Sequence, residues 1–151
     1  MILVSACLAG IRCRYDGRSR SHEDVLKLVA AGNAFPVCPE QLGGLPTPRA
    51  RAEIVGGDGS DVLRGCARVV DESGRDVTKE FVRGATECLR LARVVNAEKV
   101  VLCEGSPSCG VTRIADGTFS GKKVPGMGVT AALLRENGFH VVTLHPTALW
   151  Q

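Results

Sequence analysis

Cysteines give the strongest chemical signal in this sequence. Of the seven, Cys7 and Cys38 directly follow short apolar runs, and Cys109 lies in the loop after a third such run. Thiolates are soft ligands that suit iron–sulfur clusters, copper(I) or zinc. Three thiolates leave a coordination position open, so in a [4Fe–4S] cluster one iron would be free to bind substrate as a Lewis acid. The pattern favours a metal or cluster site with these three cysteines as ligands.

The spacing of the cysteines disfavours several familiar sites. No two of them are three positions apart, so the chain has no C-x-x-C sequence. This argues against a zinc ribbon, a thioredoxin-type dithiol and the bacterial ferredoxin run. Two alternatives stay open: a non-catalytic iron–sulfur or zinc protein that carries sulfur, and a metal-free thiol enzyme with Cys7 as nucleophile. Small cysteine phosphatases have an arginine six residues after the nucleophile, where this chain has Cys13.

Polar side chains accompany the predicted ligands. Glu40 follows Cys38 by two residues, and Ser106 and Ser108 lie just before Cys109. A carboxylate can transfer protons as a general acid or base, and hydroxyls can hydrogen-bond a small ligand. We therefore predict Glu40 and Ser106 as catalytic residues and Ser108 as a substrate-binding residue.

The other four cysteines are interpreted by their surroundings. Cys88 lies on the apolar face of a predicted helix and Cys66 in a predicted strand, where free cysteine is usually a small buried hydrophobe. Cys13 lies between Arg12 and Arg14, and Cys103 ends a predicted strand. Neither of these last two is predicted to be a ligand.

The elements that position these residues alternate between strands and helices. One helix is expected between an N-cap at Ser21 and Gly32, one from a cap at Asp76 or Thr78, and one over 128–137. Strands are expected at 2–4, 34–37, 66–70, 99–103 and 139–144. This order predicts an α/β fold with a Rossmann-like or flavodoxin-like parallel sheet, helices on both faces, and an irregular excursion over 40–76 after the second strand. Ligands of such sheets bind outside the carboxyl ends of the strands, where the predicted ligands lie.

Composition sets the broad class of protein. The 151 residues, 44% hydrophobic and 23% charged, predict one domain over 1–151 that needs no disulfide for its core. Without an export signal or an apolar run of about 20 residues, we expect a cytoplasmic protein with no membrane partner. The net charge of +3 is scattered and only 4% of residues are aromatic, which disfavours polymeric nucleic acid and favours a small ligand. Nothing in the sequence indicates an oligomeric state.

Four ordered motifs connect the chain to a known family. They are MILVSACLAGIRCRYDG at 1–17, CPEQLGGLPTPR at 38–49, SPSCG at 106–110 and DGTFSG at 116–121. With these motifs the sequence closely resembles, over nearly its whole length, a family of small bacterial proteins that includes the [4Fe–4S]-dependent thiouracil desulfidases. It departs from the family pattern after the TPR element and at Cys103, Glu104 and Gly105.

The resemblance implies an enzyme. It implies a [4Fe–4S] cluster held by Cys7, Cys38 and Cys109, with one iron open to the sulfur of a thiolated pyrimidine. The sulfur would leave as sulfide in a hydrolytic reaction without net redox chemistry. Glu40 matches the family's proton-transfer residue, and Ser106 matches the serine three residues before the last ligand. The small-molecule partner expected from the resemblance is thus a thiolated base.

Overall fold

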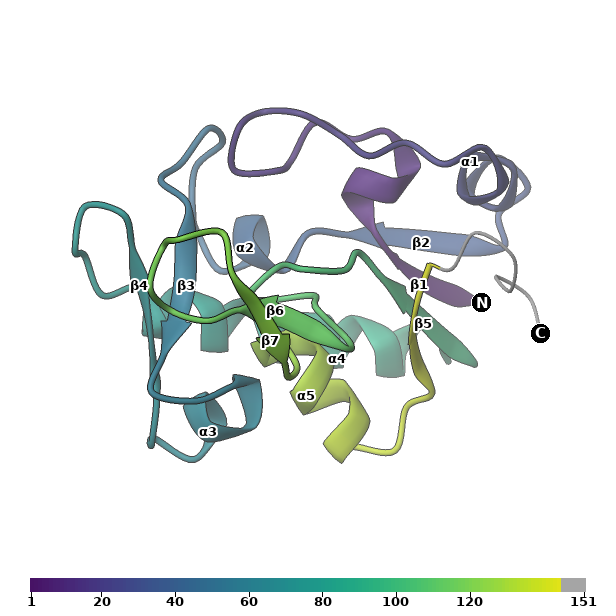
Figure 1. Ribbon diagram of the computed structural model, residues 1–151. Helices are drawn as coiled ribbons and strands as arrows, with labels where there is room; N and C mark the ends of the chain where they lie inside the picture. The colour runs from purple at the N-terminus through teal and green to yellow at the C-terminus, as the bar shows by residue number, and fades with distance from the viewer. Residues whose placement is uncertain (145–151) are drawn as a thin grey trace.

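A four-stranded parallel sheet forms the centre of the computed structural model, which describes residues 1–144 (Figure 1). Its strands are β1 (Ile2–Ser5), β2 (Ala34–Val37), β5 (Lys99–Leu102) and β8 (Val141–Thr143). They lie in the order β2-β1-β5-β8, with Ile2 opposite both Ala34 and Lys99. The first strand of the chain is therefore an inner strand between the second and the third, as in flavodoxin-like sheets.

Helices cover both faces of this sheet. Because neighbouring residues of a strand point to opposite faces, Leu3 packs in the core beneath α4 (Thr78–Val94) and α5 (Val129–Glu136), while Val4 packs with Val25 of α1 (Glu23–Ala30). Figure 1 shows α1 above the sheet and α4 and α5 below it. The predicted α/β fold, a parallel sheet with helices on both faces, is confirmed.

Two small antiparallel sheets lie beyond the carboxyl ends of the main strands. One pairs β3 (Ala52–Val55) with β4 (Arg68–Asp71), and the other pairs β6 (Arg113–Ala115) with β7 (Lys123–Pro125). The excursion also contains α2 (Pro39–Leu42) and α3 (Gly59–Leu63), and a 3-10 turn, η1 (Ala6–Ala9), follows β1. A third apolar cluster, which includes Ile54, Val69, Phe81 and Ile114, joins the excursion to α4 and α5.

Several sequence predictions need correction. Cys66 is exposed rather than buried in a strand, because its N–H bonds the carbonyl of Asp61 in the turn after α3 and β4 begins only at Arg68. The N-cap of α1 is His22 rather than Ser21, since the N–H of His22 bonds the carbonyl of Leu8 and holds it extended. Val77 is the N-cap of α4, although Asp76 Oδ1 accepts the N–H of Thr78 at 2.9 Å.

A contact between two glycines fixes α2, the short helix that follows Cys38 and contains Glu40. A Cβ added to Gly84 of α4 would lie 1.9 Å from the carbonyl oxygen of Pro39, and one added to Gly43 would lie 2.0 Å from that of Glu80. No side chain fits between these two backbones. The depth at which α2 packs against α4 therefore depends on Gly43 and Gly84.

We predict that Gly84→Ala lowers the free energy of unfolding by about 1–3 kcal/mol, because the added methyl group must push α2 and α4 apart. In an unobstructed helix the same change would raise stability by about 1 kcal/mol, so the sign of the effect is decisive. Urea unfolding measures it. Thr86→Ala on the exposed side of α4 is the control and should change stability by less than about 0.5 kcal/mol. A stabilised Gly84→Ala protein would contradict the close helix contact.

Candidate functional site

A cavity of about 560 Å³ lies at the carboxyl end of the parallel sheet. Residues that follow three neighbouring strands line it: Ser5 and Ala6 after β1, Cys38 after β2, and Cys103 and Glu104 after β5. The chain leaves β1 toward β2 on one side and β5 lies on the other, so this is the switch point at which open α/β sheets bind ligands.

Four cysteines line this cavity. Two are predicted ligands, Cys38 and Cys109, and two are the residues whose roles the sequence left open, Cys13 and Cys103. Cys7 is buried in η1 and lies behind these thiols rather than in the cavity wall. Thiol hydrogen bonds connect Cys7 to both Cys103 and Cys13. Cys13 is in turn bonded to Cys38, so the five sulfur atoms form one connected group.

The environments of the thiols differ in the protonation state that they favour. Hydrogen bonds from Cys38 and Cys7 lower the pKa of Cys13 to about 3, and a hydrogen bond from Cys7, with Arg20 and Arg14 nearby, lowers the pKa of Cys103 to about 6. The hydrogen bond to Cys103, followed by that to Cys13 and by burial, raises the pKa of Cys7. Burial raises the pKa of Cys109 to about 12. Protons shared in this way are what metal ligands must release on binding.

The arrangement of sulfur atoms fits a cluster better than a single ion. Within residues 1–144, no group of three or more His, Cys, Asp or Glu side chains is arranged to hold one metal ion. Zinc needs its ligand sulfurs about 2.3 Å from a common point, whereas an iron–sulfur cluster takes each thiolate on a separate iron. Five thiols spread around a cavity satisfy the second requirement.

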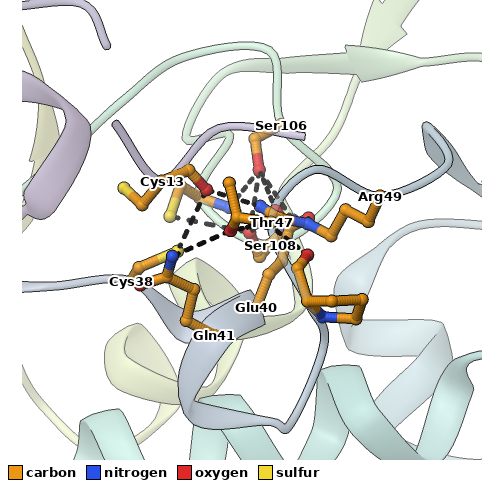
Figure 2. Close-up of polar contacts among 10 residues, drawn as sticks. Cys13, Cys38, Glu40, Gln41, Thr47, Arg49, Ser106 and Ser108 are labelled. Atoms are coloured by element: carbon orange, nitrogen blue, oxygen red, sulfur yellow. Dashed lines mark hydrogen bonds and ion pairs between the residues drawn. The ribbon is translucent and has the colours of Figure 1, made fainter. Parts of the chain in front are cut away.

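Glu40 lies beside these sulfur atoms, in a network of hydrogen bonds. Its Oε1 accepts from Nε of Arg49 at 3.0 Å, and its Oε2 accepts from the hydroxyl of Ser108 at 2.7 Å and that of Ser106 at 3.4 Å. Figure 2 shows these side chains converging from α2 and two loops. The structure thus brings together the three polar residues predicted from the sequence, and it adds Arg49, whose role the sequence did not reveal.

The loop around Ser106 and Cys109 is held by the start of α5. The N–H groups of Val129 and Thr130 bond the carbonyls of Pro107 and Ser108, at 2.8 and 2.9 Å. A Cβ on Gly128 would lie 2.5 Å from the carbonyl of Ser108, so only glycine permits this approach. Within the loop, Ser106 Oγ accepts the N–H of Ser108 and of Cys109, each at 3.1 Å. The position of Cys109 is therefore fixed by backbone contacts.

Two further carboxylates organise the loops around the cavity. Glu53 is buried and accepts the N–H groups of Gly117 and Phe119, at 3.0 and 3.1 Å, which fixes the DGTFSG loop between β6 and β7. Glu104 Oε1 accepts the N–H groups of Val111 and Arg113, at 2.9 and 3.1 Å. Sequence reasoning missed both residues because their partners are single backbone groups in distant or irregular segments.

Cationic side chains contribute much of the remaining cavity wall. The residues are Arg14, Arg20, Arg51, Arg113 and Lys123. Glu40, Glu53 and Glu104 already accept hydrogen bonds from the groups described above, so these cations make the cavity suited to a ligand with negative charge. No helix in the described part of the chain is long and apolar enough to cross a membrane.

Three comparisons with known proteins agree on what the chain resembles. It is 53% identical over 143 residues to the uncharacterised protein YbbK of Bacillus subtilis (strain 168), which covers 95% of each chain. It is 46% identical to a solved structure described as the [4Fe–4S]-dependent thiouracil desulfidase TudS, with a TM-score of 0.83 over 94% of this chain and 89% of that one. The model of the 2-thiouracil desulfurase family matches residues 2–145. The chain therefore belongs to the 2-thiouracil desulfurase family.

Proposed function

We propose that this protein is a [4Fe–4S]-dependent desulfidase that hydrolyses a thiolated pyrimidine such as thiouracil, or a similar small thioamide, to the oxygen analogue and sulfide. The observation that carries the proposal is the hydrogen-bonded carboxylate of Glu40 in a cavity also lined by Cys38 and Cys109. Membership of the desulfurase family and the likeness to a solved thiouracil desulfidase support it.

We assign the cluster to Cys7, Cys38 and Cys109, one residue from each of three loops. Each follows a strand end or lies in a loop that backbone contacts hold in place, so the three sulfur positions are set by the fold. Bound there, the cluster supplies a thiophilic Lewis acid that makes sulfur a better leaving group. Cys13 and Cys103 adjoin the three assigned residues and help to keep the cavity rich in sulfur.

The polar residues supply the proton transfers. Glu40 accepts a proton from the water that attacks the ring carbon bonded to sulfur, which is the role of a general base. Ser108 and Ser106 donate to Oε2 of Glu40 and so hold this oxygen on the cavity side of the carboxylate. The proton then goes to the departing sulfide. One water is consumed and one sulfide is released, with no electron donor or acceptor.

The alternative with Cys7 as a metal-free nucleophile is less well supported. Cys7 does not line the cavity, and hydrogen bonding to Cys103 and Cys13 together with burial raises its pKa, which favours the unreactive thiol. A protein that only stores sulfur would not need a carboxylate held against two hydroxyls beside the thiols.

Anaerobic reconstitution should give a brown protein with about four irons per chain. We predict that Cys7→Ala, Cys38→Ala and Cys109→Ala each lower the iron content severely, because each removes one of three protein ligands. Iron and sulfide analysis measures this effect. Cys66→Ala is the matched control, since Cys66 is exposed in the turn before β4, and it should bind iron as the parent does. Unchanged iron in all three variants would refute the ligand assignment.

We predict that Glu40→Gln lowers kcat about 100-fold or more, because the amide has nearly the same shape but does not accept the proton of water. Sulfide release from thiouracil measures turnover, and the iron content should stay at the parental level. Glu98→Gln is the control: Glu98 is exposed and pairs with the amino terminus. Wild-type turnover of Glu40→Gln would exclude Glu40 as the base.

A further inference from the structure

Arg49 is a nearly buried cation whose hydrogen bonds point in four directions. Its side chain is 6% exposed, and the Glu40 side chain with which it pairs is 15% exposed. Nε donates to Glu40 Oε1 at 3.0 Å and Nη2 to the carbonyl of Cys13 at 2.8 Å. Nη1 donates to the hydroxyl of Thr47 at 3.0 Å and the carbonyl of Pro46 at 3.2 Å. Four acceptors from three segments thus fix one planar guanidinium (Figure 2).

The backbone of Arg49 is held by the same neighbouring loop. Its N–H bonds the carbonyl of Tyr15 at 2.9 Å, while its side chain bonds the carbonyl of Cys13. The position of Nε relative to Glu40 is therefore set from both ends of the residue. A lysine at this position would offer a flexible point charge and would not reach all four acceptors at once.

Glu40 needs such a fixed partner because it faces space on two sides. Besides the cavity at the sheet end, a second cavity of about 250 Å³ is lined by Glu40, Arg49, Ala52 and Phe81. Glu40 and Arg49 thus form part of the wall that both cavities share. Without a directed bond to Oε1, rotation of the side chain would turn the carboxylate away from Ser106 and Ser108.

We propose that Arg49 is a positioning residue for catalysis, which holds Oε1 of Glu40 so that Oε2 stays directed at the two serines and the attacking water. The proposal rests on the proposed role of Glu40 as the base. Arg49 acts through Glu40 and not through the substrate, so its loss reduces the rate of the chemical step and leaves substrate binding in place.

The test is a double-mutant cycle on the reconstituted enzyme. Arg49→Lys keeps the charge and should lower kcat about 10-fold or more, with KM within about 3-fold of the parent, because small misplacements of a catalytic group are costly. When Glu40 is already glutamine, adding Arg49→Lys should change kcat less than about 2-fold, since the two residues act as one unit. Arg90→Lys, exposed on α4, is the matched control and should behave as the parent.

A second variant guards against misfolding of Arg49→Lys. Thr47→Val removes one acceptor of the guanidinium and leaves both charges in place, so it should lower kcat about 3-fold with an unchanged KM and unchanged iron content. Iron content and circular dichroism of every variant are measured alongside turnover.

The possible outcomes separate this proposal from the proposed function. A raised KM with parental kcat in Arg49→Lys would mean that Arg49 binds substrate, and losses that multiply in the double variant would mean that it acts independently of Glu40. Either result overturns the positioning role and leaves the desulfidase proposal intact. Wild-type turnover of Glu40→Gln alone would overturn both the base assignment and the role of Arg49.

Discussion

The inner position of β1 in the parallel sheet is the constraint on which the site depends. With β2 on one side and β5 on the other, the carboxyl ends of three strands meet at one edge. The segments that leave these ends carry Cys7, Cys38 and Cys103, and the loop after β5 continues to Cys109. Each residue is remote from the others in sequence, so only this pairing of strands brings their thiols together. Sheet topology thus determines which cysteines can share one group.

Close backbone contacts and buried charges then fix the loops at this edge. Gly43 and Gly84 set the depth of α2, and Gly128 allows α5 to donate to the carbonyls before Cys109. The Arg49–Glu40 pair adds a costly interaction, because two charges leave water, and the hydrogen bonds around them offset that cost. An ion pair of this kind is a poor source of stability. Its directed geometry is more useful for holding a carboxylate in one orientation.

The regular part of the fold could be predicted from the sequence, and parts of the excursion could not. The apolar runs at 34–37 and 99–103 predicted β2 and β5 almost to the residue, because a buried parallel strand needs a continuous apolar segment. The strands β3, β6 and β7 were missed, since each has only three or four residues among glycines and prolines. Cys66 was placed wrongly for a related reason: the apolar run that follows it begins pairing two residues later. The partners of Arg49 depend on tertiary packing, as Glu40 and Cys13 lie 9 and 36 positions away.

The central claim is that sulfur leaves by hydrolysis at this site, and isotope labelling tests it directly. The reconstituted protein is incubated anaerobically with thiouracil in ¹⁸O-labelled water, without any reductant or oxidant, and both products are measured. The account predicts one sulfide per uracil formed and one ¹⁸O atom in each uracil. Sulfide release without incorporation of the label, or a requirement for an electron donor, would contradict it.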